Sequence, residues 1–212
     1  MTSDSDRERM LDLLMRRGIE DERVLAAMRA VPRHLFVDAA LVGQAYADGP
    51  LPIGEGQTIS QPFIVALMTQ ALRLRRGERV LEIGSGSGYQ AAVLAEMGMR
   101  VFSVERCPTL AERARRLLAS LGYQSVTVRC GDGNEGWAEE APFDAVLITA
   151  AAREVPRAPY AQLRMRGRML LPLGDEEEQE LALIDKTPEG PREVCLGSCR
   201  FVKLIGRHGW AV

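Results

Sequence analysis

The chain has 212 residues and a net charge of −2, with 46% of residues hydrophobic and 26% charged. This length favours one domain over two independent cores, and the composition excludes an intrinsically disordered chain. Without an overall positive charge, binding to nucleic acid or to anionic membranes is not expected.

Residues 1–10 are polar and mostly charged, and no apolar run approaches the roughly 20 residues that span a bilayer. We therefore expect a cytoplasmic protein without an export signal or a transmembrane helix. The cysteine spacing matches neither a CxxC pair nor a metal knuckle, so we expect buried, reduced thiols and no metal site. Neither histidine, His34 or His208, is given a catalytic role. The cysteines are Cys107, Cys130, Cys195 and Cys199.

Two short helices are predicted at the N-terminus. Leu11, Leu14 and Met15 follow helical spacing, and a second helix over residues 21–30 ends before Pro32. These helices form an extension ahead of the main core.

A loop rich in glycine and proline is predicted over residues 48–57, where glycines would let the backbone approach another group closely. A helix is predicted to follow it, with Ser60 as the N-cap and Pro62 in the first turn. Its apolar face is formed by Ile64, Leu67, Met68, Ala71 and Leu72.

Strand-like and helical segments alternate from residue 77 onward. Near-continuous apolar strands alternating with amphipathic helices predict a parallel sheet that is covered on both faces. The strands are 79–83, 100–104, 125–129 and 143–149, and the helices are 89–97 and 110–121. Three further strand-like segments, joined by short turns, predict antiparallel pairing at one edge of the sheet. They are 168–173, 180–186 and 194–205.

A glycine-rich turn follows the first strand of the sheet. Gly84, Gly86 and Gly88 are spaced as GxGxG and open a helix, so a ligand can approach backbone N–H groups there. A dinucleotide fingerprint, GxGxxG, would place glycine or alanine where Tyr89 stands. On the strand before the turn, Glu82 would repel a pyrophosphate but would tolerate a cationic ligand.

Acidic residues follow the next two strands. Glu105 can accept hydrogen bonds from both hydroxyls of a ribose, and Asp132, between two glycines, can hold an adenine amino group. Alternatively, Glu105 caps the helix that begins near Pro108, and Asp132 is an ordinary turn residue. The glycine turn, Glu105 and Asp132 each follow one of three predicted strands. Together they predict a binding site for a nucleoside that carries no diphosphate.

Residues 80–89 resemble the first motif of the class I S-adenosylmethionine-dependent methyltransferases. Residues 48–54 and 56–62 resemble the signature of one family of that class, the protein-L-isoaspartate O-methyltransferases, and residues 57–62 are far more specific than the glycine turn. The likeness covers about residues 19–210. Further matching segments are 31–34, 84–92, 121–123, 131–133, Trp137, 141–144 and 149–151.

The resemblance implies an α/β fold with a doubly wound, mainly parallel, Rossmann-like methyltransferase sheet. Helices cover both faces, an N-terminal helical extension precedes the sheet, and antiparallel C-terminal strands form one edge. We expect a single methyltransferase domain over residues 1–212, working as a monomer. Its parts are a helical extension and substrate loop (1–60), a donor-binding core (61–150), and C-terminal strands with a substrate wall (151–212).

The resemblance also implies roles for individual residues. Residues 200–204 match a late strand near the peptide, except that Lys203 stands where proline is expected, and Ser85 stands where threonine is usual. Ser60 is the expected catalytic residue. The substrate would be bordered by Thr58, Ile59, Ser60 and Val65. The donor, S-adenosylmethionine, would be held by Glu82, Gly84, Ser85, Gly86, Glu105, Asp132 and Gly133.

The family reaction transfers a methyl group from S-adenosylmethionine to the free carboxylate of an L-isoaspartyl residue in a damaged protein or peptide. The resulting ester collapses to a succinimide. A free carboxylate, with a pKa of about 4, is already an anion at neutral pH, so no general base is required. Ser60 and the free N–H groups of its helix are expected to bind this carboxylate. The alternative is that Ser60 only caps the helix.

Other functions stay open at this point. The chain is alternatively a methyltransferase of the same fold acting on a small-molecule acid or another protein carboxylate, or a non-catalytic domain that binds S-adenosylmethionine. A nicotinamide-dependent oxidoreductase is disfavoured by Tyr89 and Glu82.

Overall fold

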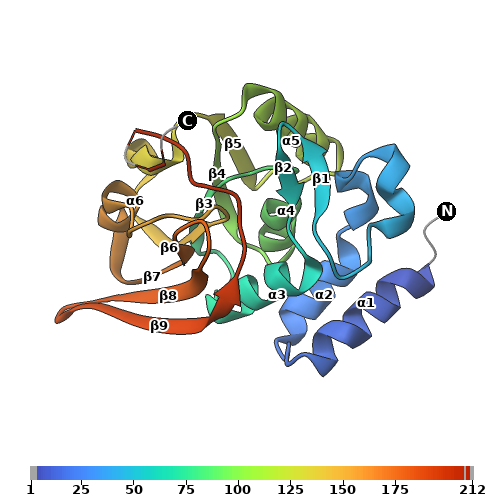
Figure 1. Ribbon diagram of the computed structural model, residues 1–212, viewed down its shortest axis with the longest axis horizontal. Coiled ribbons are helices and arrows are strands. Elements are labelled where there is room, and N and C mark those ends of the chain that lie inside the picture. The colour runs from blue at the N-terminus through green and yellow to red at the C-terminus, as the bar shows by residue number, and fades with distance from the viewer. Residues whose placement is uncertain (1–3, 208, 211–212) are drawn as a thin grey trace.

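The computed structural model describes residues 4–207 and 209–210, so His208 lies outside the described residues. Its centre is a seven-stranded sheet with the order β5-β4-β3-β6-β7-β8-β9 (Figure 1). Strands β5 to β7 in that order are parallel, and β8 and β9 pair antiparallel at one edge, which confirms the predicted sheet. The strands are β3 (Arg79–Ile83), β4 (Arg100–Glu105), β5 (Val126–Cys130), β6 (Phe143–Ile148), β7 (Leu163–Gly174), β8 (Gln179–Thr187) and β9 (Gly190–Cys199).

Apolar side chains of the central strands face two hydrophobic clusters, one on each side of the sheet. In β6, Ala145 and Leu147 belong to one cluster, and Val146 and Ile148 belong to the other. Helices α3, α4 and α5 contribute to the first cluster, and α6 contributes to the second. The α-helices are α1 (Asp4–Arg16), α2 (Glu22–Ala30), α3 (Pro62–Ala71), α4 (Tyr89–Glu96), α5 (Pro108–Ser120) and α6 (Arg157–Ala161). None of the helices in the described residues is long and apolar enough to cross a bilayer.

The expectation of buried cysteines is wrong, because Cys130 and Cys195 are exposed and Cys107 and Cys199 are only half-buried. Cys130 ends β5, and Cys195 and Cys199 lie on β9; both are edge strands of the sheet, where side chains are less covered.

The predicted N-terminal helices are present as α1 and α2, which lie beside α3 (Figure 1). Leu11 and Leu14 are fully buried, whereas Met15, expected on the same face, is 47% exposed. Asp21 caps α2 by accepting a hydrogen bond from the Arg23 amide. The extension is therefore packed into the same hydrophobic cluster as α3 and α4.

The predicted loop over residues 48–57 is wrong in part, because most of it forms a β-hairpin. Strands β1 (Leu51–Gly54) and β2 (Gln57–Ile59) pair antiparallel. Glu55 and Gly56 connect them with positive φ angles of 53° and 67°. Two successive residues with positive φ make the tight turn that suits a hairpin, but Glu-Gly lacks the Asn or Asp that usually announces it.

The last predicted strand, residues 194–205, is also partly wrong, because β9 ends at Cys199. Beyond it the chain crosses to the end of β6, where the Ala151 amide donates to the Val202 carbonyl and the Leu204 amide donates to the Ala151 carbonyl, at 2.7 and 2.8 Å. This crossing brings residues 202–205 to the edge of the sheet where the central parallel strands end, which is the usual place for a ligand in such folds.

Candidate active site

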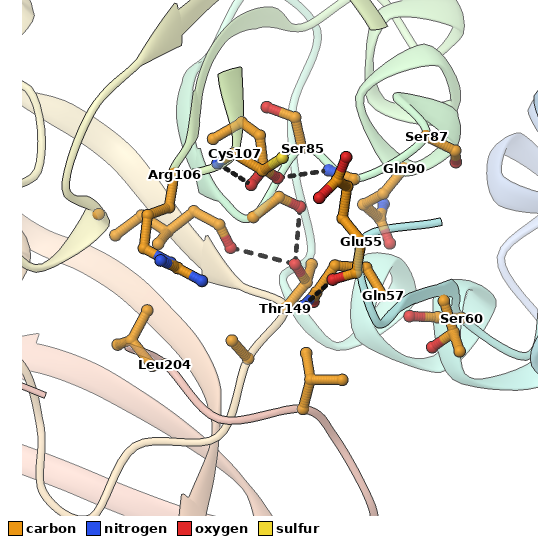
Figure 2. Close-up of a pocket in the computed structure, with 18 of the residues that line it drawn as sticks. Glu55, Gln57, Ser60, Ser85, Ser87, Gln90, Arg106, Cys107, Thr149 and Leu204 are labelled. Carbon is orange, nitrogen blue, oxygen red and sulfur yellow. Dashed lines mark hydrogen bonds between the residues drawn. The ribbon is translucent and has the colours of Figure 1, made fainter. Parts of the chain in front are cut away.

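A crevice of about 280 Å³ lies at the carboxyl ends of the central strands. Figure 2 shows Ser85, Arg106 and Cys107 on one side of it, Gln57 and Ser60 on the other, and Thr149 between them. Most of the residues expected from the sequence line this crevice, whereas Glu82 and Asp132 are not among the lining residues. Those that line it are Thr58, Ile59, Ser60, Val65, Gly84, Ser85, Gly86, Glu105 and Gly133.

The glycines of the site are needed mainly for contacts within the protein. Gly84 has a φ of 96°, and a Cβ on it would lie 2.3 Å from Oγ1 of Thr149. A Cβ on Gly133 would lie 2.2 Å from Cγ2 of Ile83. The sequence explained these glycines by the approach of a ligand to the backbone. The structure adds a second reason, because a larger residue at either position would collide with a neighbouring side chain.

Glu105 holds the glycine turn and the start of α5 together. One carboxylate oxygen accepts a hydrogen bond from the Gly86 amide and the other accepts one from the Cys107 amide, both at 2.9 Å. The expected alternative, a capping role at the helix that begins at Pro108, is therefore present in the structure. Each carboxylate oxygen can accept a further hydrogen bond, so the capping role and the proposed contact with ribose are compatible.

Glu82 lies beneath the crevice and is fully buried. Ser103 donates a hydrogen bond to it, and the Ser103 and Ser85 hydroxyls lie 2.5 Å apart. The pKa of Glu82 is raised to about 8, mainly because the carboxyl group is buried; the hydrogen bond from Ser103 opposes this rise, and the charge of Glu105 adds to it. The side chain is thus mostly protonated at pH 7, so the expected repulsion of a pyrophosphate by an ionised Glu82 is much weakened. Its contact with the donor stays a prediction.

Asp132 is engaged by the C-terminal segment. Its carboxylate accepts hydrogen bonds from the Asn134 amide at 2.9 Å and from the Arg207 amide at 2.7 Å. These bonds hold the turn after β5 against residues 206–207. The expected contact between Asp132 and an adenine amino group stays a prediction.

Ser60 is not the N-cap of its helix, which corrects the expectation from the sequence. Helix α3 begins at Pro62, with Gln61 in the N-cap position and no cap bond from its side chain. The Asp48 carboxylate caps the helix instead, because it accepts from the Phe63 amide at 3.0 Å and from the Gln61 side chain at 2.8 Å. A carboxylate of the chain itself therefore occupies the N-terminal end of the helix dipole.

The Ser60 hydroxyl makes no hydrogen bond with another described residue. Its side chain is half-buried at the wall of the crevice. This leaves the hydroxyl available to a ligand and removes the alternative that Ser60 serves only as a helix cap.

Thr149 is a site residue that sequence reasoning did not single out. Its hydroxyl donates to the carbonyl oxygens of Ile83 and Gly84, at 3.1 and 2.8 Å, and so joins the ends of β6 and β3. Its position directly after a central parallel strand was the available signal, because ligands in such sheets bind where the strands end.

A second hollow, of about 700 Å³, adjoins the crevice. Four residues, Thr58, Ser60, Thr149 and Val202, line both. Most of its remaining wall comes from α3 and from residues 196–202, with Arg17, Pro50, Gln61 and Leu181 completing it. Two arginines line this hollow, and no acidic residue does. Arg17 is paired with Asp48 at 2.6 Å, whereas Arg200 is exposed and forms no ion pair with the described residues.

Lys203 lies at the crevice and not in the second hollow. Its ammonium group pairs with Glu176 at 2.6 Å and lies 5.0 Å from the centre of the Trp210 ring. These contacts direct the charge of the unexpected lysine toward the turn between β7 and β8 and toward Trp210.

The chain is similar to known proteins over nearly its whole length. Residues 5–209 match the model of the family described as protein-L-isoaspartate(D-aspartate) O-methyltransferase. A protein-L-isoaspartate O-methyltransferase of Syntrophobacter fumaroxidans is 57% identical, with 96% of each chain covered. One of Syntrophus aciditrophicus is 54% identical, covering 97% of this chain and 96% of the relative.

Solved structures agree with these matches. A protein-L-isoaspartate O-methyltransferase structure superimposes with a TM-score of 0.88 at 31% identity, covering 96% of this chain and 67% of its own. A structure from Plasmodium falciparum, described with the same activity and in complex with S-adenosyl-L-homocysteine, gives a TM-score of 0.81 at 27% identity. It covers 94% of this chain and 98% of its own.

Proposed function

This chain belongs to the protein-L-isoaspartate(D-aspartate) O-methyltransferase family, and from that premise we propose how its site performs the family's reaction. The reaction repairs damaged proteins by methylating the free carboxylate of L-isoaspartyl residues, with S-adenosylmethionine as the donor. The observation that carries the proposal is the shared wall, since Ser60 and Thr149 border both the crevice and the second hollow. We assign the crevice to the donor and the second hollow to the peptide.

The crevice fits a nucleoside donor. Glu105 is held with lone pairs left over, and the backbone of the glycine turn lies open beside it. A Cβ on Gly86 would lie 3.3 Å from Cδ1 of Ile53, which is a tight contact, and the φ of 50° at this position is one that residues with a side chain rarely adopt. Donor contacts are assigned to Gly84, Ser85, Gly86, Glu105 and Gly133, with Glu82 supporting them from beneath and Asp132 at the rim.

When bound, S-adenosylmethionine supplies a methyl group carried on a positively charged sulfur. The isoaspartyl carboxylate that accepts it is already an anion at neutral pH, so no side chain of this chain has to remove a proton. The task of Ser60 is to donate a hydrogen bond to one carboxylate oxygen and leave a lone pair of the carboxylate free to react. Thr58, Ile59 and Val65 exclude water and hold the substrate backbone.

The second hollow accommodates the residues that flank the lesion. Its walls include half-buried apolar side chains, among them Ile64 and Leu67, which the sequence places on the apolar face of α3. Room of about 700 Å³ next to Ser60 suits a peptide. The family match over residues 5–209 disfavours the alternative of a methyltransferase for small acids, and the free Ser60 hydroxyl disfavours a non-catalytic binding domain.

The test is transfer of a labelled methyl group to two matched peptides that differ only in an isoaspartyl or an aspartyl linkage. We expect label in the isoaspartyl peptide alone. Equal labelling of both peptides, or label only in a small acid, would overturn the proposed function. Activity as a monomer, in the cytoplasm and without nucleic acid stays a prediction from the sequence, and light scattering of the purified chain tests the first of these.

A further inference from the structure

Arg33 is a fully buried arginine that contacts the residue we place at the substrate. Its Nη2 donates to the carbonyl of Ser60 at 2.8 Å, and its Nε donates to the carbonyl of Ala45 at 2.8 Å. The guanidinium thus fixes the backbone just before α3.

The same guanidinium also contacts the donor side of the site. Its central carbon lies 4.7 Å from the centre of the Tyr89 ring. Tyr89 is buried, begins α4 directly after the glycine turn, and lines the crevice. Arg33 is therefore placed between Ser60 and the turn that we assign to the donor.

Stability of the fold alone does not explain a buried arginine at this position. Arg33 forms no ion pair with the described residues, and its Nη1 has no hydrogen-bond partner. Asp48, whose charge acts on Arg33, is itself bound to Arg17. Burial of a cation without a contacting carboxylate is costly, and an apolar side chain of similar volume is often the more stable choice. An apolar residue, however, could not donate hydrogen bonds to the carbonyls of Ala45 and Ser60, as Arg33 does.

We propose that Arg33 is a positioning residue for methyl transfer, which holds the Ser60 carbonyl in place relative to the donor turn and thereby orients the Ser60 hydroxyl. The inference rests on the proposed role of Ser60. A planar guanidinium suits this task because its rigid fork of donors reaches two carbonyl groups at once, whereas an ammonium is a single flexible point of charge. Small displacements of a reacting group are enough to cost about 10²-fold in rate.

The experiment compares Arg33→Lys with the wild type and with Arg23→Lys. Arg23 also donates to a backbone carbonyl, that of Leu74, but lies in the helical extension away from the site. Calorimetric titration with S-adenosylhomocysteine counts the folded sites, and kcat and KM for an isoaspartyl peptide are measured per site. We expect Arg33→Lys to lower kcat by about tenfold or more and to leave the affinity for S-adenosylhomocysteine unchanged. Arg23→Lys is expected to behave as the wild type.

A second comparison asks whether Arg33 acts through Ser60. In the Ser60→Ala background, Arg33→Lys is expected to lower kcat no further, because the hydroxyl that Arg33 orients is absent. If the fold-losses in kcat of the two single variants multiply in the double variant, the proposal is overturned. So would an unchanged kcat per site in Arg33→Lys, or an equal loss of S-adenosylhomocysteine affinity, which would assign Arg33 to the donor turn.

If Arg33→Lys does not fold, replacement of the Ser60–Gln61 amide by an ester weakens the carbonyl as an acceptor while Arg33 stays in place. We expect a lower kcat with normal binding of S-adenosylhomocysteine, and an unchanged kcat would overturn the proposal. A wild-type chain that leaves isoaspartyl peptides unmethylated would refute the proposed function, whereas these variants refute only the role of Arg33.

Discussion

The Ser60 hydroxyl forms no hydrogen bond with another described residue. Ser60→Ala therefore removes no contact that the fold uses. We expect the variant to keep the unfolding temperature and the affinity for S-adenosylhomocysteine, and to lose about 10²-fold in kcat for isoaspartyl peptides. Single-turnover transfer of a labelled methyl group measures the loss. Turnover equal to that of the wild type would show that Ser60 does not act on the substrate.

Glu105 has the opposite character, since both of its oxygens already hold backbone amides at 2.9 Å. Glu105→Ala removes these bonds together with the proposed acceptor for the ribose hydroxyls. We expect the dissociation constant for S-adenosylhomocysteine to rise about tenfold or more, measured by calorimetry. A variant that binds as tightly as the wild type would contradict the assignment of Glu105 to the donor.

At the scale of single residues, sequence patterns predicted position better than contacts. Nine of the expected site residues line the crevice. Five of them end or follow parallel strands, whose carboxyl ends meet at one edge of the sheet, and the other four come from β2, α3 and the segment between them. The partners were not predictable, since they come from distant segments. Asp48 caps α3 through the Phe63 amide, which lies 15 residues further along the chain. Arg33 donates to the carbonyl of Ser60, 27 residues away in the sequence.

At the scale of elements, the segment that follows β9 supplies Arg200, whose charge lies at the second hollow. Arg200 forms no ion pair there with the described residues, so we expect it to favour an acidic residue near the lesion. Arg200→Gln should raise KM for acidic peptides up to about fivefold, in keeping with an exposed ion pair, and leave KM for neutral peptides unchanged. Arg192→Gln, on β9 but outside the hollow, is the matched control. Equal effects on acidic and neutral peptides would contradict this role.

The elements that were predicted well are those with a strong hydrophobic period. Strand β3 matches its predicted bounds, and α4 and β6 differ from theirs by one residue at the C-terminal end. The β1–β2 hairpin and the end of β9 were missed in whole or in part. The hairpin has strands of four and three residues, too short for a period to show, and residues 200–205 are held by tertiary pairing with Ala151.

At the scale of the whole molecule, buried Glu82 couples stability to pH. Because its pKa in the folded protein, about 8, lies above the usual value of 4.5, the folded state holds a proton that the unfolded state releases. The contribution of Glu82 is therefore fully present below about pH 4.5 and is lost as pH rises through about 8.

Glu82→Gln keeps a neutral side chain at every pH. We expect the unfolding free energy of the wild type to fall, relative to this variant, by a few kcal/mol, as an order of magnitude, between pH 5 and pH 9. Urea unfolding at several pH values measures the difference. A difference that does not change with pH would show that Glu82 is ionised in the folded protein.

The carboxylates that brace the site also bear on how the enzyme itself ages. Asp48 and Asp132 are each followed by glycine, the sequence context in which an aspartyl side chain is most easily attacked by the next backbone nitrogen. Asp48 is held by the Phe63 amide and Arg17, and the Gly49 nitrogen donates to Ala47. Asp132 is held by the Asn134 and Arg207 amides. We expect these contacts to slow, at the enzyme's own Asp48 and Asp132, the formation of the lesion that it repairs in other proteins.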